Sequence, residues 1–214
     1  MLSCLATTGG EAKSCLRYMD MDLDNVKQQD VVLALCKLNN FHYGDVWVHL
    51  RKTMPVTLDI PQEFFQRGVN EIVENFRGWD MRGIIAVDST VTKKNPDGKD
   101  KVVGFVLYQI HRETKIELEV LFLLVSKAYR NKRHATNMLK TLEDRHIFTH
   151  GNDVVKFFTV KVDRNDTVVE FYRKLGYEDM SKVAGYADCF STYSDYTHMI
   201  RRGVLLTHEM NGAS

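Results

Sequence analysis

A short basic segment separates an apolar stretch from an amphipathic one in the second half of the chain. Residues 126–136 have the sequence SKAYRNKRHAT and follow an apolar run that ends at Val125. Such an order predicts a strand, a turn and a helix, with unpaired N–H groups and the positive end of the helix dipole at the turn. Because these groups bind phosphate oxygens, the segment is predicted to bind an anion.

The segment from Arg130 to Ala135 resembles the Arg/Gln-x-x-Gly-x-Gly/Ala loop that holds the pyrophosphate of acetyl-coenzyme A in the GNAT superfamily of N-acetyltransferases. Arg130 and Ala135 match this pattern. Arg133 stands where the family usually has glycine, which lets the backbone approach the phosphate closely. Two consequences stay open: the Cβ of Arg133 pushes the loop outward, or its guanidinium compensates with a bidentate phosphate contact.

A second motif lies downstream at the expected distance. Residues 165–177, NDTVVEFYRKLGY, are similar to the Asn-x-x-Ala-x-x-Phe-Tyr-x-x-x-Gly-Phe helix of the same superfamily. The pattern also fits an ordinary amphipathic helix with Val168, Phe171 and Leu175 in the core and Gly176 as its C-cap. Both interpretations hold together, because helices of the family pack that face as well.

The resemblance implies an α/β (α+β) fold with a central mixed, mainly antiparallel sheet flanked by helices. One strand is expected to splay at the cofactor site, near Glu119–Val125. The predicted acetyltransferase domain spans residues 24–202. Residues 1–23 are predicted to be a loosely ordered N-terminal tail, and residues 203–214 a C-terminal tail.

Hydrophobic periodicity predicts the elements of this domain. A helix from Asp24 has Val26, Leu33, Cys36 and Leu38 on one face, and a second helix starts at the Asp59-Ile60-Pro61 cap. Further elements are strands at 83–89, 101–111 and 115–125, a helix at 135–146, a strand at 154–162, a helix from Asn165, and one or two closing strands that contain Tyr186, Phe190, Tyr193 and Tyr196.

Amine acetylation needs a base, because an alkylammonium with a pKa of ~10.4 is ~4.6 kcal/mol from its free-base form at pH 7. The resemblance implies Glu119, at the position of the general-base glutamate in the histone-acetyltransferase branch. Strand alternation places Glu119 on the face of Leu121 and Leu123, where apolar surroundings raise a carboxyl pKa. Glu117 is the alternative base, and both carboxylates also fit a solvent-facing position on the strand.

Three further roles follow from the resemblance. Tyr172 is expected to be the general acid near the thioester sulfur, although a packed tyrosine also fits its position. Asn165 is expected to contact the pantetheine arm, or to cap its helix. A backbone N–H near Leu123 is expected to stabilise the oxyanion.

The predicted cofactor site combines the end of a strand, the basic turn and the downstream helix. His134 either contacts a phosphate or only begins its helix. His146 and His150, beside Glu143 and Asp144, have the spacing of a metal pair. A position near a fraying helix end, where imidazole suits the negative end of the helix dipole, is the preferred interpretation, so no metal is predicted. The predicted cofactor-binding residues are Leu123, Leu124, Val125, Arg130, Asn131, Lys132, Arg133, His134, Ala135, Thr136, Asn165 and Tyr172.

Composition narrows the class of protein. The 214 residues are 44% hydrophobic with a net charge of +1, which favours one substantial core and gives no electrostatic signal for nucleic acid or membrane binding. The four cysteines form no Cys-x-x-Cys pair, as is typical of reduced thiols, so a cytoplasmic or nuclear location is expected.

The sequence therefore predicts an N-acetyltransferase that moves acetyl from acetyl-coenzyme A to a primary amine in a ternary complex. A protein lysine or amino terminus is the favoured acceptor, and a polyamine or aryl-alkylamine is the alternative. A catalytically inactive acyl-coenzyme A binding module stays open because of Arg133. The protein is expected to be a monomer or a homodimer.

Overall fold

The computed structural model describes residues 16–51, 79–90, 101–111, 117–147, 157–163, 165–182 and 196–202. Its elements in chain order are β1 (Leu16–Asp20), α1 (Val26–Asn39), α2 (Tyr43–Arg51), β2 (Trp79–Asp88), β3 (Lys101–His111), β4 (Glu117–Val125), the 3₁₀ turn η1 (Lys127–Tyr129), α4 (His134–Ile147), β5 (Phe157–Asp163), α5 (Asp166–Lys174), β6 (Glu178–Asp179), the 3₁₀ turn η2 (Met180–Lys182) and β7 (Tyr196–Arg202).

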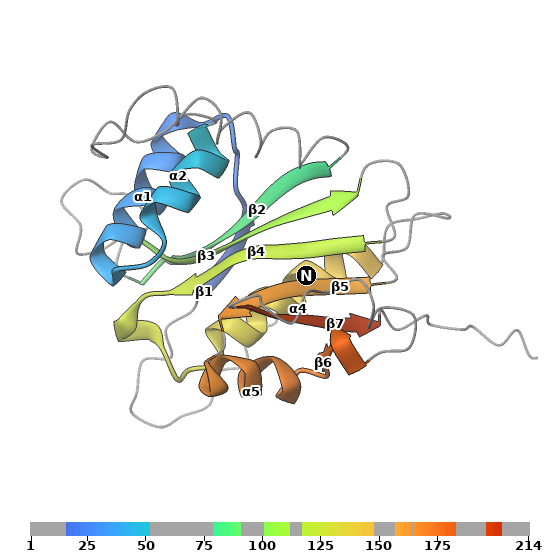
Figure 1. The fold of residues 1–214 in the computed structure, drawn as a ribbon. Helices are drawn as coiled ribbons and strands as arrows, with labels where there is room; N and C mark the ends of the chain where they lie inside the picture. Colours follow the sequence, from blue (N-terminus) through green and yellow to red (C-terminus); the bar gives the residue numbers. More distant parts are fainter. Residues whose placement is uncertain are drawn as a thin grey trace, which may run out of the picture.

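The described strands form one seven-stranded sheet in the order β1-β2-β3-β4-β5-β7-β6 (Figure 1). Adjacent strands are antiparallel except β4 and β5, which run parallel. The predicted mixed, mainly antiparallel sheet is therefore confirmed. The parallel pair requires a crossover, and α4 lies between its strands in the chain.

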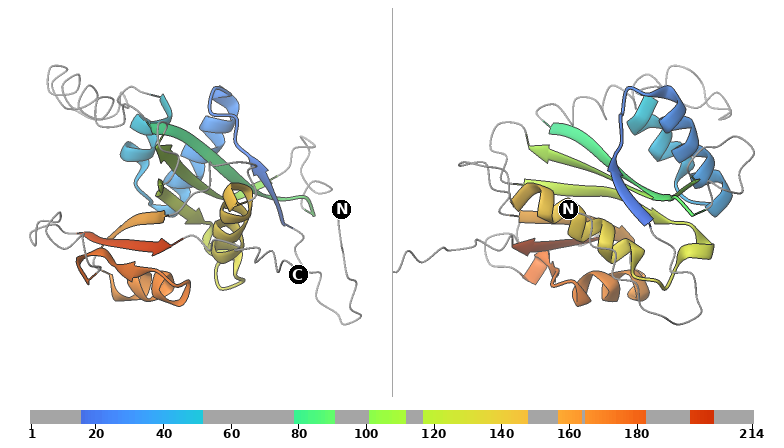
Figure 2. Two further views of the ribbon diagram at one scale, coloured as in Figure 1. Left: turned by 90° about the vertical axis from the view of Figure 1, so that its right-hand side faces the viewer. Right: turned by 180° about the vertical axis from the view of Figure 1, so that it is seen from behind.

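Helices cover both faces of the sheet. Helices α1 and α2 lie on one face and α4 on the other, as Figure 2 shows. The α1–α2 side is packed by residues such as Val32, Cys36 and Phe105, and the α4 side by residues such as Met138 and Leu142. Helix α5 joins the α4-side core through Val169 and Tyr172. Gly176, with a φ of 84°, follows the end of α5, as the sequence predicted for a C-cap glycine.

Strand β4 changes partners along its length. It pairs with β3 from Leu118 to Val125, but its pairing with β5 stops at Val120 and Val160. A β-bulge adds Leu121 to β4, because Phe122 pairs with Leu107 and Val120 pairs with the next residue of β3. Beyond Val120, the β5-facing edge of β4 is therefore open, as expected for the splayed strand.

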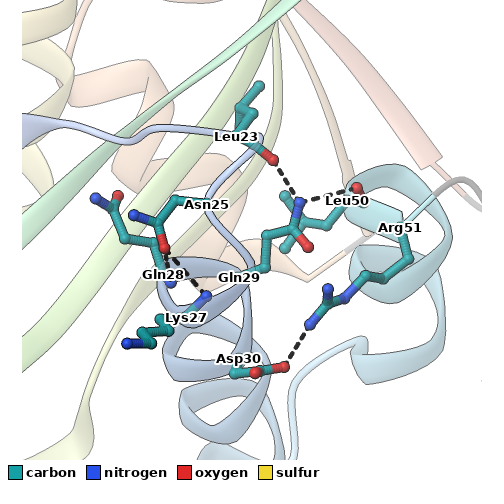
Figure 3. A network of polar contacts seen from close by, with 8 residues as sticks. All are labelled: Leu23, Asn25, Lys27, Gln28, Gln29, Asp30, Leu50 and Arg51. Carbon is teal, nitrogen blue, oxygen red and sulfur yellow. Dashed lines mark hydrogen bonds and ion pairs between the residues drawn. The ribbon is translucent and has the colours of Figure 1, made fainter.

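A polar network fixes α2 against α1 (Figure 3). The buried Gln29 amide donates to the carbonyl oxygens of Leu23 and Leu50, and Arg51 forms an ion pair with Asp30. The side chain of Asn25 caps α1 by accepting hydrogen bonds from backbone N–H groups of the first turn. These contacts hold α2 over one face of the sheet.

Strand β1 clamps α4 at both ends. The Tyr18 hydroxyl lies 3.4 Å from Nδ1 of His134 at the start of α4. Near the helix end, Arg145 forms an ion pair with Asp20 and donates to the carbonyl oxygen of Tyr18. The expectation of a loose segment through residue 23 was therefore wrong for residues 16–20, which pair with β2. Their short, mostly exposed alternation is a weak strand signal.

Helices α1 and α2 differ in part from the sequence prediction. The sequence did not predict α2. Val26 and Leu38, expected on the buried face of α1, are 55% and 80% exposed, because Val32, Leu33, Leu35 and Cys36 form that face. The predicted helix from Asp59 and the predicted strand positions of Tyr186, Phe190 and Tyr193 lie outside the described residues.

His146 lies near the end of α4, as the sequence predicted, and its side chain is buried. Its Nε2 lies 3.1 Å from the Tyr108 hydroxyl. Burial, together with the positive charges of Arg82 and Arg145, lowers the pKa of His146 to about 4. The folded protein therefore holds this imidazole neutral at pH values where the unfolded chain protonates it.

We expect acid to destabilise the fold through His146. The unfolded chain binds a proton near pH 6.5 and the folded protein only near pH 4, so stability falls as pH decreases through this window, by about 3 kcal/mol from this group. Chemical unfolding of wild type and His146→Gln between pH 7 and pH 4 measures the effect. The variant should lose less stability over the window, and equal losses would contradict the assignment.

Candidate functional site

A pocket of about 540 Å³ opens beside the basic turn, where β4 leads through η1 into α4. We call it the turn pocket. Its wall combines the open end of β4, the first turn of α4 and one face of α5. The lining residues are Phe41, Leu123, Leu124, Val125, Tyr129, Arg130, Asn131, Arg133, His134, Ala135, Thr136, Val168, Phe171 and Tyr172.

The backbone of the basic turn adopts the conformation that glycine favours. Asn131 and Arg133 have φ values of 63° and 59°, in the left-handed region. Arg133 therefore takes up the backbone conformation of the glycine it replaces, and its exposed side chain points away from the buried core. His134, Ala135 and Thr136 of the first turn of α4 line the pocket, and the unpaired N–H groups of a helix start suit phosphate oxygens.

A buried carboxylate holds the turn in place. Asp88, at the end of β2, accepts a 2.7 Å hydrogen bond from the Tyr129 hydroxyl, and it accepts two more from the N–H and hydroxyl of Thr90. Burial acts to raise the pKa of Asp88, but these hydrogen bonds and the nearby Lys101 outweigh it, so the pKa is lowered. Asp88 is thus ionised at neutral pH and anchors η1 to the sheet.

His134 lies in the wall of the turn pocket as the first residue of α4. It is buried, and its Nε2 has no hydrogen-bond partner among the described residues. Burial and the charge of Lys132 lower the pKa of His134, so its ring is neutral at physiological pH. An orphaned buried nitrogen beside an anion-binding turn is suited to contact a bound ligand.

A second pocket, of about 380 Å³, lies on the α2 side of the open strand edge. We call it the α2 pocket. It shares Phe41, Leu123, Val168 and Tyr172 with the turn pocket, so the two meet where β4 and β5 separate. The residues that line it are Phe41, His42, Asp45, His49, Val120, Leu121, Phe122, Leu123, Val160, Lys161, Val162, Val168, Tyr172 and Tyr196.

Glu119 lies on the face of the sheet that α1 and α2 cover, and its surroundings are polar. Its Oε2 accepts a 2.8 Å hydrogen bond from the Gln109 amide, and its Oε1 lies 3.5 Å from Nζ of Lys161. The expectation that Glu119 shares a face with Leu123 was wrong, because the bulge at Leu121 moves Leu123 to the other face. Glu119 itself lines neither pocket, and it contacts Lys161, which lines the α2 pocket.

Glu117 lies two residues further from the splay. It accepts a 3.2 Å hydrogen bond from the Thr159 hydroxyl, and burial raises its pKa. A raised pKa suits a carboxylate that must accept a proton near neutral pH, but Glu117 lies further along the strand from the splay. The assignment of the base to Glu119 stays a prediction that rests on its position in β4.

Tyr172 lies where the two pockets meet. Its side chain is 4% exposed and packs against Phe171 and Tyr177. Burial raises its pKa, so the phenol stays protonated across the physiological range. Tyr172 is thus a packed residue, as one alternative held, and it also lines both pockets, whereas its role as general acid stays a prediction.

The sequence matches the family model described as the Acetyltransferase (GNAT) family over residues 58–177. The match covers more than half of the chain. The chain belongs to the GNAT family. A search among curated proteins gives no match.

Solved structures agree with the GNAT fold. A putative GNAT acetyltransferase from Desulfovibrio desulfuricans superposes with a TM-score of 0.53 at 10% identity, over 88% of this chain and 98% of that one. An aminoglycoside 6'-N-acetyltransferase complexed with coenzyme A gives a TM-score of 0.51 at 16% identity, over 88% and 98%. A GNAT acetyltransferase from Staphylococcus aureus gives 0.51 at 10% identity, over 89% and 100%. Identities this low show the fold alone.

Most of the predicted GNAT site residues come together. Ten of the twelve predicted cofactor-binding residues line the turn pocket, whereas Lys132 and Asn165 do not. The Asn165 side chain caps α5 by accepting from the N–H of Thr167, which fits the alternative that the sequence left open. Phe41 was missed. It lies in both pockets because Asn40, with a φ of 54°, caps α1 and turns the chain there.

Among the described residues, no three or more His, Cys, Asp or Glu side chains gather closely enough to hold a metal ion. His150, one half of the weak metal hypothesis, lies outside those residues. None of the described helices is both long and apolar enough to span a membrane.

Removing the Tyr129 hydroxyl should weaken coenzyme A binding. Tyr129→Phe loses the charge-assisted hydrogen bond to Asp88, worth about 1.5–3 kcal/mol, part of which orders the turn before ligand binds. We expect calorimetry to show a Kd about five- to tenfold higher. Asp30→Asn, which breaks the exposed ion pair with Arg51 at a distance from the turn, is the control and should bind as wild type does.

The Arg133→Gly variant tests whether the Arg133 side chain obstructs the cofactor site or contacts a phosphate. Glycine tolerates the left-handed backbone, so stability should change by no more than about 1 kcal/mol. If the guanidinium contacts phosphate, the Kd for coenzyme A should rise about tenfold, and its salt dependence should weaken. Tighter binding by the glycine variant would instead show that the Arg133 side chain obstructs the site.

Proposed function

We propose that this GNAT protein transfers an acetyl group from acetyl-coenzyme A to a primary amine, with both substrates bound at once. One observation carries the proposal: Tyr172 borders two pockets that meet where β4 leaves β5. A thioester carrier in the turn pocket and an amine in the α2 pocket would meet beside a protonated phenol. Direct attack is then possible without an acyl-enzyme intermediate.

The residues of the turn pocket fit coenzyme A. The N-terminus of α4, Arg130 and Arg133 suit the pyrophosphate, and the orphaned Nε2 of His134 offers a further polar contact. The open β5-facing edge of β4 suits the amide groups of the pantetheine arm, which would take the place of the missing strand. A solved GNAT neighbour, the aminoglycoside 6'-N-acetyltransferase, carries coenzyme A.

In this proposal, Glu119 accepts a proton from the amine and Tyr172 donates one to the leaving thiolate. Glu119 accepts the proton of the amine as the amine nitrogen bonds to the acetyl carbon and the carbon–sulfur bond breaks. Tyr172 donates its hydroxyl proton to the departing sulfur, which yields the free thiol. Glu119 returns its proton to solvent, and the phenol regains one. A backbone N–H of β4 beyond the bulge is the proposed donor to the acetyl oxygen.

Among acceptors, a protein lysine or amino terminus is proposed first, because the position of Glu119 resembles that of the base in the histone-acetyltransferase branch. A small-molecule amine, such as a polyamine or aryl-alkylamine, is the second candidate. An inactive acyl-coenzyme A binding module is the third. Calorimetry with coenzyme A, followed by turnover on a mixed panel of amines and peptides, distinguishes them. Binding without turnover on any acceptor favours the module, and no binding overturns the proposal.

Glu119→Gln should lower kcat by about 10²–10⁴-fold, with the greatest loss at neutral pH and partial recovery at alkaline pH, where more amine is unprotonated. Glu117→Gln is the matched variant two residues away and should retain most activity. If Glu117→Gln is the inactive variant, the base is Glu117.

Tyr172→Phe should lower kcat by about tenfold or more while the Kd for coenzyme A changes little, because only the hydroxyl is lost. A single-turnover assay with acetyl-coenzyme A measures the loss. An unchanged rate would assign Tyr172 to packing alone.

A further inference from the structure

Lys161 occupies the point where the two central strands part. It directly follows Val160, the last residue of β5 that pairs with β4. Its side chain is 57% exposed and lines the α2 pocket. The cation therefore lies beside the place where the proposed acetyl transfer occurs.

Lys161 and Glu119 form a pair of opposite charges at this point. Nζ lies 3.5 Å from Oε1 of Glu119, and the Glu119 side chain is only 14% exposed. Gln109 holds the other carboxylate oxygen. An ammonium has three donors, so one contact with Glu119 leaves Lys161 able to bind a further acceptor group in the pocket.

No other fixed cation lines the described part of the α2 pocket. Its remaining ionisable groups are His42, Asp45, His49 and the phenols of Tyr172 and Tyr196. Asp45 is 68% exposed and lies 3.4 Å from His42. On β7, His198 lies opposite Lys161 in the strand register. Burial is the main cause that lowers the pKa of His198, and the Lys161 charge adds to it, so His198 adds no positive charge at neutral pH.

A half-buried carboxylate beside an exposed ammonium is complementary to a molecule with the opposite arrangement of charges. An acceptor that carried only an ammonium would be attracted by Glu119 but repelled by Lys161. An acceptor with a carboxylate a few bonds from its amine would satisfy both groups. The amine would face Glu119, and the carboxylate would face Lys161.

We infer that the α2 pocket selects amines that carry a neighbouring carboxylate, with Lys161 as the residue that binds the carboxylate. This inference rests on the proposed function and specifies its acceptor. Such chemistry comes from two sources, a free α-amino acid or a peptide whose amino-terminal residue is acidic. The bonds that form and break in the transfer are those already described.

Matched acceptors test the inference. Acetylation is measured for a set of α-amino acids against their amides, and for a peptide that begins with aspartate against the same peptide beginning with asparagine. A lysine peptide with a blocked amino terminus is the acceptor without a neighbouring carboxylate. The enzymes are wild type, Lys161→Gln, Lys161→Arg, and Lys174→Gln, which removes an exposed lysine of α5 outside both pockets.

We expect wild type and Lys174→Gln to prefer the carboxylate member of at least one pair by about tenfold or more in kcat/KM. Lys161→Gln should lose this preference, mainly through a higher KM, and Lys161→Arg should keep most of it. The pair with the larger ratio identifies the source of the acceptor. On the lysine peptide, Lys161→Gln should show a lower KM than wild type, because the repulsion between Lys161 and the acceptor ammonium is removed and no carboxylate contact is lost.

Two outcomes overturn the inference by different routes. Lys161 does not select the acceptor if wild type shows no preference for the carboxylate member of either pair. The same holds if wild type shows the preference and Lys161→Gln retains it. In both cases the proposed acetyl transfer stands. If the protein binds no coenzyme A and acetylates none of them, the proposed function fails, and the inference fails with it.

Discussion

The end of pairing between β4 and β5 is the constraint on which the rest of the site depends. Backbone groups in a sheet need partners, and the edge of β4 beyond Val120 has none from β5. That edge separates the turn pocket from the α2 pocket, and Leu123 contributes to both. The bulge at Leu121 reverses the alternation of side chains along β4, so that Glu119 and Leu123 lie on opposite faces of the sheet.

Supporting contacts hold the elements around this gap. On one side, Asp88 fixes Tyr129 and thereby the basic turn. On the other, Gln29 joins α2 to α1, and this places Asp45 and His49 along the α2 pocket. These contacts come from buried or half-buried polar groups, which are costly to leave unpaired. The geometry of the site is therefore set largely before any ligand binds.

Local patterns predicted the elements and the motifs, but not the contacts between distant segments. The basic turn, the α5 helix with Gly176 and the strands predicted at 101–111 and 115–125 are local features, and their patterns are visible in the sequence. The bulge depends on the register with β3, and the pairing of Glu119 with Lys161 depends on two parallel strands separated by α4. Phe41 enters the site only because α1 ends in a left-handed turn. None of these follows from the spacing of residues alone.

The contacts of β1 with α4 link the edge of the sheet to the basic turn. Tyr18 touches the start of the helix, while Asp20 holds Arg145 near its end. Because β1 contacts α4 near both ends, a displacement of β1 is expected to shift the start of α4 and the basic turn next to it. This holds although β1 and the turn are far apart in the chain. Shortening or fusing the protein upstream of Leu16 is thus a matter for ligand affinity as well as for solubility.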